Sequence, residues 1–271
     1  MGFELQPQSN YSETGEDGYM CTITAIVNRK GGVGKTTTSV NLAADLALKQ
    51  KKVLLVDMDP QGGSTVALGI DKRNLTKTVY SSVVDGLPLS DVTLSSSISG
   101  LDVAPSNLEM DGAELSIAPR MARELILRRL LAPVISNYDQ IIIDCPPTMG
   151  LLTLNALLAC DQVVVPVMAE YHSLEGTEDI RQTLEDIASF YNHQPRRRFL
   201  VTMASKVNNH GRAVIKVLRE QFEGDVYDTI IPRNIKVAEA PSFGKPVSLY
   251  APNSPGAKAY KKFAEEFLNE Q

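Results

Sequence analysis

A glycine-rich loop between a strand pattern and a helix pattern constrains this chain more than any other feature. The apolar run Thr22 to Val27 leads into residues 28–37 (NRKGGVGKTT), and a helical pattern follows from Thr38 to Leu48. Glycines let successive backbone N–H groups point at phosphate oxygens, the start of the helix adds the positive end of its dipole, and Lys35 supplies a charge. The sequence therefore predicts a phosphate-binding loop, in which Thr36 is placed to ligate Mg²⁺.

This loop departs from a strict P-loop at its start. A glycine is expected five residues before Gly34, but Arg29 stands there, and Lys30 is an extra lysine directly before the glycine pair. Taken alone, Lys30 could be a solvated loop lysine. The preceding strand and following helix favour nucleotide binding over a chance glycine turn. The expected nucleotide contacts of this loop are Gly31, Gly32, Val33, Gly34, Lys35, Thr36 and Thr37.

Short apolar runs alternate with helix patterns along the chain. They are apolar throughout, as in strands buried on both faces, and the segments between them are long enough for crossover helices. This pattern predicts an α/β fold with a doubly wound, mostly parallel sheet flanked by helices. We expect a single domain over residues 21–271. The expected strands are Thr22 to Val27, Val53 to Val56, Leu101 to Ala104, Gln140 to Ile143, Val163 to Val167 and Phe199 to Val201.

Aspartates end two of these expected strands. Asp57 and Asp59 follow Val53 to Val56, and Asp144 follows Gln140 to Ile143. Ligand chemistry in parallel sheets lies at the carboxyl ends of the strands, and alternation puts Asp57 and Asp59 on the same side. A lone aspartate there is equally often a helix N-cap, but three after a phosphate loop favour catalysis. We expect Asp57 and Asp144 to serve the Mg²⁺ shell with Thr36, and Asp59 to position the attacking water.

The charge is unevenly distributed. The chain carries 27 Lys+Arg against 32 Asp+Glu, a net charge of -5 that taken alone argues against nucleic acid as a partner. Residues 1–20 hold four acidic residues, three glycines and no Lys or Arg, which is typical of a disordered acidic tail. Residues 196–219 hold seven Lys and Arg and no acid: Arg196, Arg197, Arg198, Lys206, Arg212, Lys216 and Arg219.

A helix pattern over Gly211 to Phe222 would place three of these cations on one face, because they are four and three residues apart. One interpretation is that DNA phosphates contact Lys206, Arg212, Lys216, Arg219 and Arg233. From the residues alone, a solvated helix face with a basic turn explains the pattern equally well.

Other compositional features exclude several classes. The three cysteines show no metal-ligand spacing, and their odd number without a secretory signal suggests reduced thiols in a cytoplasm. No apolar stretch approaches the ~18 residues of a membrane span. The histidines show no triad or ligand spacing, so we assign them no catalytic role. These residues are Cys21, Cys145, Cys160, His172, His193 and His210.

In combination, these motifs resemble the ParA/Soj partition ATPases. The loop over residues 30–37 is similar to the deviant Walker A loop with its signature lysine. Asp57 to Gln61, Asp144 to Pro147 and the two segments 231–234 (IPRN) and 239–242 (EAPS) complete the resemblance. It extends from about Thr22 to Phe267 and includes no additional N-terminal DNA-reading domain.

The resemblance implies an ATP-sandwich homodimer, in which Lys30 reaches the phosphates of the partner's ATP. It implies slow, partner-stimulated ATP hydrolysis with Lys30, Lys35 and Asp59 as catalytic residues, and sequence-independent binding of double-stranded DNA in the ATP state. It further implies a ParB-like adaptor, a cytoplasmic, nucleoid-associated location, and a role in plasmid or chromosome partitioning. Pro232 and Asn234 would lie along the adenine, although Pro-Arg-Asn is equally a plain turn.

The alternative function is that of a MinD-like membrane-associated positioning ATPase, or a positioner of another large cargo. MinD-like proteins of the same superfamily attach through a basic amphipathic C-terminal helix. Here Ala257 to Leu268 is amphipathic, but its three lysines are balanced by nearby glutamates. A membrane-surface helix favours Lys and Arg on its polar face, so we expect this helix to pack against the domain, with no membrane partner.

Overall fold

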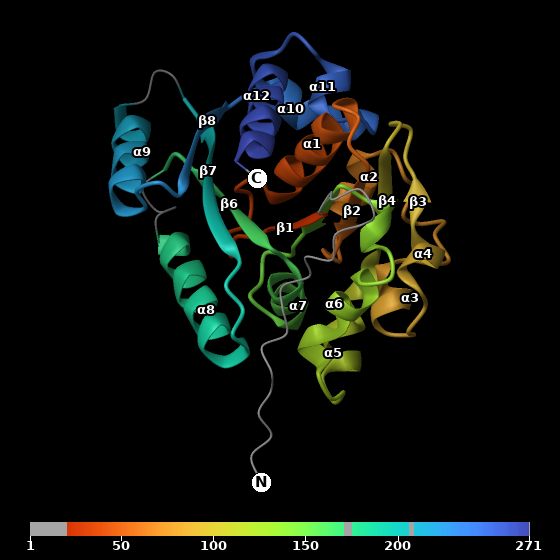
Figure 1. Ribbon diagram of the computed structural model, residues 1–271. Helices are drawn as coiled ribbons and strands as arrows, with labels where there is room; N and C mark the ends of the chain where they lie inside the picture. Colours follow the sequence, from red (N-terminus) through yellow and green to blue (C-terminus); the bar gives the residue numbers. More distant parts are fainter. Residues whose placement is uncertain (1–20, 171–174, 206–208, 271) are drawn as a thin grey trace.

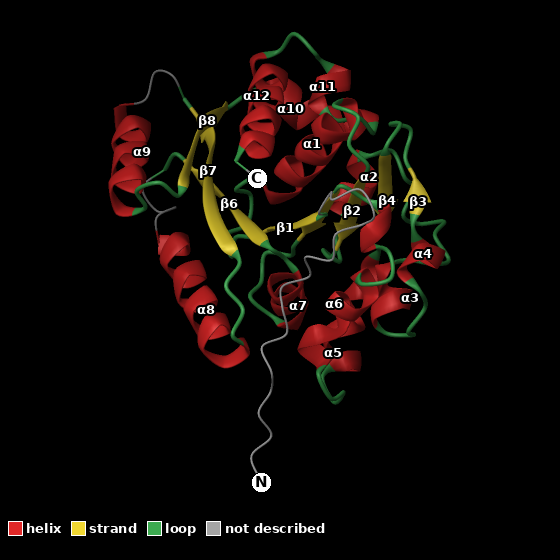
Figure 2. Ribbon diagram, viewed as in Figure 1, coloured by secondary structure: helices red, strands yellow, loops and turns green. Residues whose placement is uncertain are grey.

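Eight strands form one sheet in the order β3-β4-β2-β5-β1-β6-β7-β8 (Figures 1 and 2). The computed structural model describes residues 21–170, 175–205 and 209–270, so the acidic tail predicted at 1–20 lies outside the described residues. All pairs in this sheet are parallel except β3 with β4. The predicted fold class is therefore confirmed. The strands are β1 Thr22–Ile26, β2 Val53–Asp57, β3 Leu94–Ser95, β4 Leu101–Ala104, β5 Gln140–Asp144, β6 Gln162–Met168, β7 Arg196–Ala204 and β8 Val226–Pro232.

Helices cover both faces of the sheet because alternate strand residues point to opposite sides. Leu54 and Val56 of β2 belong to one core, and Val53 and Leu55 belong to the other. The first core is covered by α3 Val79–Val83, α4 Leu89–Val92, α5 Ala113–Ile117, α6 Ile126–Leu131, α7 Leu151–Ala159, α8 Glu175–Tyr191 and α9 Asn209–Gln221. The second is covered by α1 Lys35–Leu48, α2 Gly63–Ala67, α11 Val247–Tyr250 and α12 Pro255–Asn269.

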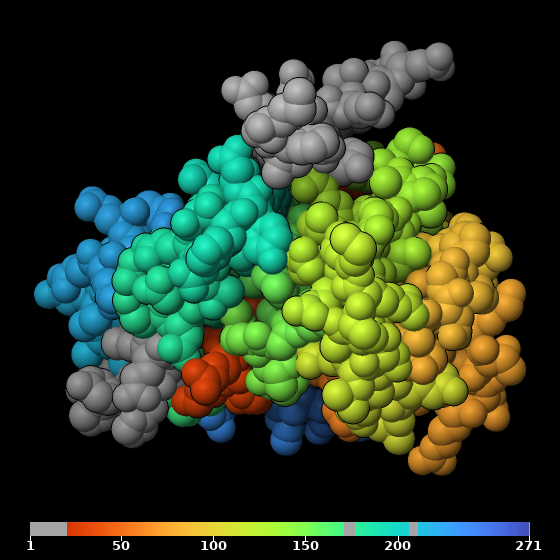
Figure 3. Space-filling view, turned by 90° about the horizontal axis from the view of Figure 1, so that it is seen from below, coloured from red at the N-terminus to blue at the C-terminus, as the bar shows by residue number. Residues whose placement is uncertain are grey.

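The first helical layer is seen from outside in Figure 3. In that view α8 (teal) lies beside the segments of α5 to α7, and the chain around α3 and α4 (orange) lies at the far end. Short helical turns join the longer elements: α10 Ile235–Glu239, and the 3-10 helices η1 Leu108–Gly112, η2 Arg123–Leu125, η3 Ile135–Asn137 and η5 Ala240–Phe243.

The C-terminal helix α12 packs into the domain. Ser254 caps it by accepting a hydrogen bond from the backbone N–H of Ala257 at 3.2 Å, and Pro255 occupies its first turn. Tyr260, Phe263 and Phe267 are buried in the core shared with α1. The packing predicted from the balanced charges is therefore observed. Among the described residues, no helix is long and apolar enough to cross a membrane.

The sequence analysis missed two strands and misplaced two helix boundaries. In β8 buried and exposed residues alternate, as is typical of an edge strand, so it shows no continuous apolar run. The two-residue β3 is too short to leave a pattern. Helix α1 begins at Lys35 and not at Thr38. The sequence also shows a helix pattern between Leu75 and Val84, of which only Val79–Val83 is helical, after a Thr78 capping box.

Candidate active site

The loop between β1 and α1 is fixed by neighbouring strands. The Asn28 side chain accepts a hydrogen bond from the Lys30 backbone N–H at 2.9 Å and donates one to the Pro166 carbonyl of β6 at 2.8 Å. Thr202 of β7 donates its hydroxyl to the Val33 carbonyl at 2.8 Å. Gly34 has a φ of 95°, a left-handed conformation that favours glycine. Contacts from β6 and β7 thus fix the shape of the loop.

Lys35 points back into this loop. Its Nζ donates a hydrogen bond to the Lys30 carbonyl at 3.2 Å, and the side chain is buried. Burial lowers the pKa of Lys35, while the charges of Asp144 and Asp59 raise it in part. Lys30 itself is half-buried, and the glycines that follow it, Gly31 and Gly32, are exposed. A buried cation beside a glycine-rich loop is suited to an oxyanion such as phosphate.

Asp144 lies at the end of β5 and is completely buried. Its Oδ1 accepts a hydrogen bond from the Ser39 hydroxyl at 3.0 Å, and its Oδ2 accepts one from the Ser64 hydroxyl at 2.7 Å. Burial raises the pKa of Asp144, and hydrogen bonds from Ser64, Thr36 and Ser39 oppose that shift. The three hydroxyls therefore stabilise the ionised carboxylate beside the phosphate loop.

Asp57 ends β2, where the register pairs it with Asp144. Its Oδ2 accepts hydrogen bonds from the Thr65 hydroxyl at 2.7 Å and the Thr65 backbone N–H at 2.9 Å, and its Oδ1 accepts one from the Asp59 N–H at 3.2 Å. Burial raises the pKa of Asp57, and the charge of Asp144 raises it further. Both Asp57 oxygens are occupied by protein donors, so this residue anchors the segment from Asp59 to Thr65.

Asp59 begins a tight turn that rests on the phosphate loop. Its Oδ1 accepts a hydrogen bond from the Gln61 N–H at 2.9 Å, and its carbonyl accepts one from the Gly62 N–H at 2.9 Å. A Cβ on Gly62 would lie 2.8 Å from the Ser106 carbonyl, and one on Gly63 would lie 3.0 Å from the Thr36 methyl group. Gly63 therefore allows the turn to approach Thr36 closely, and Gly62 allows it to approach Ser106.

These residues fit a magnesium ion that is completed by a nucleotide. Among the described residues, no group of three or more His, Cys, Asp or Glu side chains is placed to hold a metal by itself. Mg²⁺ commonly binds one or two carboxylates together with phosphate oxygens and water. Two buried carboxylates side by side, with Lys35 near one of them, leave negative charge that a divalent cation would neutralise. Thr36 and Asp144 would hold it, with Asp57 acting behind them.

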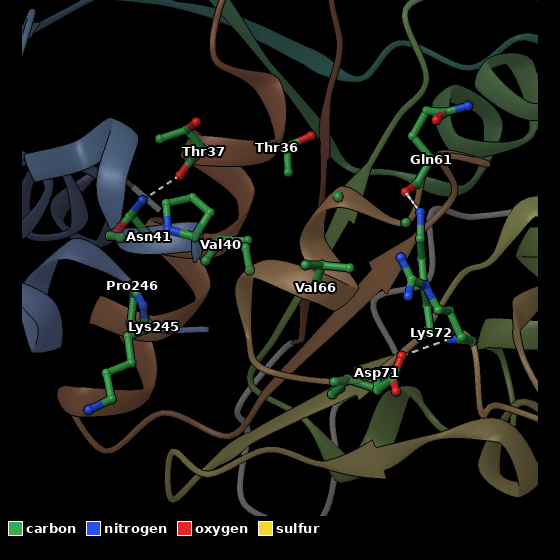
Figure 4. Close-up of a pocket in the computed structure, with 17 residues that line it drawn as sticks. Thr36, Thr37, Val40, Asn41, Gln61, Val66, Asp71, Lys72, Lys245 and Pro246 are labelled. Carbon is green, nitrogen blue, oxygen red and sulfur yellow. Dashed lines mark hydrogen bonds between the residues drawn. The ribbon is translucent and has the colours of Figure 1, made fainter. Parts of the chain in front are cut away.

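A cavity of about 670 Å³ adjoins the loop (Figure 4). Thr36 and Thr37 line it together with α2 and with Ala240, Pro241, Lys245 and Pro246. Lys72 donates to the Gln61 carbonyl on its opposite side. Pro232 and Asn234, the predicted adenine contacts, are not among its lining residues. They lie at the end of β8, where the Asn234 Oδ1 caps α10 by accepting from the Lys236 N–H at 3.1 Å.

The predicted DNA contacts are brought together only in part. Arg212, Lys216 and Arg219 are exposed on α9 and line one open groove of about 630 Å³, here called the α9 groove. Lys216 is paired with Glu220 at 3.6 Å and Arg219 with Asp228 at 3.7 Å. Arg233 lies at the end of β8, outside this groove, and pairs with Glu170 at 3.5 Å. Lys206 falls outside the described residues.

The other arginines of the basic stretch stabilise the fold. Arg197 pairs with Asp225 at 2.9 Å and lies over the rings of Phe199 and Phe222. Arg198 is buried over the Tyr227 ring and donates to the Glu270 Oε1 at 2.8 Å. Arg196 donates to the carbonyl of the same Glu270. Of the seven cations, three on β7 therefore make contacts within the fold, and three on α9 are exposed.

Sequence reasoning missed the residues that orient the predicted ones: Asn28, Ser39, Ser64 and Thr65. All four are polar and buried. The sequence offers a signal for Ser64 and Thr65, because they directly follow the Gly62-Gly63 pair, whose tight turn could bring their hydroxyls back to the carboxylate at the end of β2. Ser39 lies one helical turn after Lys35 and shares its face of α1, which is a weaker signal.

Comparison with known proteins gives a consistent relationship. An AAA domain family matches residues 21–196. The chain is 47% identical over 248 residues to the sporulation initiation inhibitor protein Soj of Bacillus subtilis, covering 91% of this chain and 98% of that protein. It is 40% identical to the chromosome partitioning protein ParA of Myxococcus xanthus, covering 91% of this chain and 87% of that one.

Solved structures agree on the fold. A cobyrinic acid a,c-diamide synthase from Mycobacterium smegmatis with bound ADP and magnesium superposes with a TM-score of 0.81 at 32% identity, covering 93% of this chain and 95% of that one. The septum site-determining protein MinD from Pyrococcus horikoshii, complexed with Mg-ADP, gives a TM-score of 0.77 at 23% identity and covers 92% and 96%. This second likeness concerns the fold alone.

Proposed function

Because the chain belongs to the Soj/ParA family of chromosome-partitioning ATPases, we propose that it binds Mg-ATP, dimerises around it and then binds DNA without sequence preference. Hydrolysis, stimulated by a ParB-like adaptor, would release the DNA and so drive partitioning of a chromosome or plasmid. The observation that carries this proposal is that Lys35, Thr36, Asp144 and the Asp59 turn meet at one phosphate loop.

The chemistry follows from that arrangement. The phosphates would lie on the backbone N–H groups of residues 31–37, with Lys35 beside the terminal ones. Bound Mg²⁺ supplies charge neutralisation at the phosphate oxygens. Asp59 is 9% exposed and fixed by the Gln61 N–H, so it can orient a water at the rim of the site. Asp57 holds the Asp59 backbone N–H and keeps this turn in place.

Dimerisation would complete the site. The residues directly before the buried part of the loop, Gly31 and Gly32, are exposed, so a second copy can approach the phosphates there. Lys30 of that copy would place a positive charge against the charge that develops during phosphoryl transfer, as an arginine finger does. Turnover would then depend on dimerisation, so we expect slow hydrolysis by the isolated chain.

DNA binding is assigned to the α9 groove. Its three cations are exposed, and each dimer would present two such grooves, which doubles the number of phosphate contacts. No aromatic side chain of the described residues lines the groove, so contact would be with phosphates and not with stacked bases. Arg233 can add a contact near the nucleotide edge by leaving its exposed pair with Glu170.

The test is charge reversal in the groove. We compare Arg212→Glu/Arg219→Glu with the matched control Lys258→Glu/Lys262→Glu, which reverses two exposed charges on α12. DNA affinity with ATP should fall in the groove variant alone, with a smaller dependence on salt. ATP hydrolysis without DNA should remain in both variants, which shows that the fold is intact. Unchanged salt-sensitive DNA binding in the groove variant contradicts the assignment, and pelleting with liposomes but not DNA would favour the MinD-like alternative.

A further inference from the structure

We propose that the acidic N-terminal segment, residues 1–20, docks in the α9 groove of its own protomer and competes there with DNA. The inference rests on the proposed DNA-binding function and adds a regulator to it. The chain would carry its own competitor for the phosphate-binding face, so that only the dimer, with two grooves on one DNA, displaces both segments effectively.

The α9 groove offers both charge and apolar surface. Arg212, Lys216 and Arg219 line it together with Ile215 and Ile230, which are half-buried. Glu220 and Glu223 also line it, both near the C-terminal end of α9. The pairs of Lys216 with Glu220 and of Arg219 with Asp228 are long and exposed, at 3.6 and 3.7 Å. Such pairs are exchanged easily for a new anionic partner.

The N-terminal segment has the complementary composition. It contains Glu4, Glu13, Glu16 and Asp17 and no Lys or Arg. It also contains apolar and aromatic residues, namely Phe3, Leu5, Tyr11 and Tyr19. A peptide of this kind can place carboxylates on the cations and a side chain on Ile215 and Ile230. DNA phosphates can pair only with the cations, so the segment would make apolar contacts in the groove that DNA phosphates cannot make.

The topology places the segment near the groove. β1 begins at Thr22, and the starts of β6, β7 and β8 lie at the same edge of the sheet, as the pairing of Thr24 with Gln162 and of Gln162 with Arg196 shows. Helix α9 ends at Gln221, five residues before β8 begins, so its C-terminal half lies toward this edge. From β1 to β8 there are three strand spacings, or about 14 Å.

The length of the segment fits this span. A flexible chain of 20 residues has a root-mean-square end-to-end distance of about 25 Å, and fully extended it reaches about 66 Å. The groove is therefore within reach of the same protomer, at a separation where a tethered ligand has an effective concentration of about a millimolar. Weak contacts, each screened by salt, are sufficient for partial occupancy at that concentration.

The main experiment measures DNA affinity in the presence of ATP, using the full chain. The segment is neutralised by Glu4→Gln/Glu13→Gln/Glu16→Gln/Asp17→Asn. The matched control is Asp85→Asn/Asp91→Asn/Glu109→Gln/Asp111→Asn, which changes the net charge equally at exposed positions near α3 to α5. We expect the segment variant to bind DNA about 3- to 10-fold more tightly at 50 mM salt and less than about 2-fold more tightly at 200 mM. The control should change far less.

A second experiment detects the docked segment directly. The sequence contains no tryptophan, so Phe3→Trp introduces a single fluorescent reporter. Its emission should be blue-shifted at low salt and should move to the value of the unfolded chain when DNA and ATP are added. The same move is expected when Phe3→Trp is combined with Arg212→Glu/Arg219→Glu in one protein. Emission that already equals that of the unfolded chain at low salt would overturn the proposal.

The two proposals fail in distinguishable ways. If no variant binds DNA under any condition, the DNA-binding function fails and the competition fails with it. If DNA binds in the ATP state but the segment variant and its control behave identically, only the competition is wrong. A blue shift that persists in Arg212→Glu/Arg219→Glu would also overturn it, because the segment would then dock elsewhere.

Discussion

Removing the Ser64 hydroxyl tests how the structure prepares Asp144 for magnesium. Ser64 donates to the Asp144 Oδ2 at 2.7 Å, and both residues are completely buried. A hydrogen bond to a charged group contributes about 1.5 to 3 kcal/mol, which corresponds to about 10- to 100-fold in an equilibrium constant. Ser64→Ala should therefore weaken Mg²⁺ binding in the nucleotide complex by about that factor, as is typical when a residue behind a metal ligand is lost.

The pH dependence sharpens this prediction. Burial already raises the pKa of Asp144, and the Ser64 hydrogen bond is one of the interactions that lower it. Without that bond, protons should compete with Mg²⁺ at higher pH than in the unchanged chain. The loss of affinity should therefore be larger at pH 6 than at pH 8.

The assay is the Mg²⁺ dependence of the affinity for a fluorescent ADP analogue at both pH values. Ser116→Ala is the control, because the Ser116 hydroxyl is exposed and donates only to the Gly112 carbonyl at 3.0 Å. An unchanged Mg²⁺ midpoint in Ser64→Ala would refute the role given to Asp144. A loss of nucleotide affinity of equal size without Mg²⁺ would show instead that the variant distorts the loop.

Three further predictions concern stability and turnover. Burial raises the pKa of Asp45 from 3.8 to about 6, so the protonated carboxyl supports the fold at low pH and this stability is lost as the pH rises through about 6. Asp45→Asn should therefore raise the free energy of unfolding by about 2 kcal/mol at pH 7 and by much less at pH 4, as measured by urea denaturation. Asp59→Ala should retain ATP binding but reduce single-turnover hydrolysis by about 10²-fold, and equal hydrolysis rates would contradict its role. Glu270→Ala leaves the buried Arg198 without its carboxylate and should cost about 2 kcal/mol by thermal unfolding, whereas Glu220→Ala, from an exposed pair, should cost less than about 0.5 kcal/mol.

The central part of the fold could be predicted because its strands are buried on both faces. β1, β2 and β5 are buried at almost every position, which requires the continuous apolar runs that the sequence shows. The edge strand β8 has one side partly exposed, and Asp228 and Thr229 interrupt its apolar residues. Local sequence does not distinguish β8 from a turn, so the motif at Pro232 shows no sign of the strand that ends there.

The residues of the site also differ in whether local sequence reveals them. Residues that would touch the phosphates, such as Lys35 and Thr36, follow a local spacing that the sequence displays. Those that hold Asp144 come from α1 and α2, so Ser39 and Ser64 meet only after folding. In the basic stretch, counting charges along the chain overestimates the exposed positive charge. The count includes Arg198, which is paired with Glu270, 72 residues away.

The central claim is that ATP controls DNA binding. It is tested most directly by the affinity of the unchanged chain for a duplex without a specific site, measured with ATP, with ADP and without nucleotide at about 50 and 200 mM salt. We predict binding with ATP that is at least about 10-fold tighter than with ADP and that weakens steeply with salt, because two grooves then act on one DNA. Equal affinity in the three nucleotide states would contradict the account.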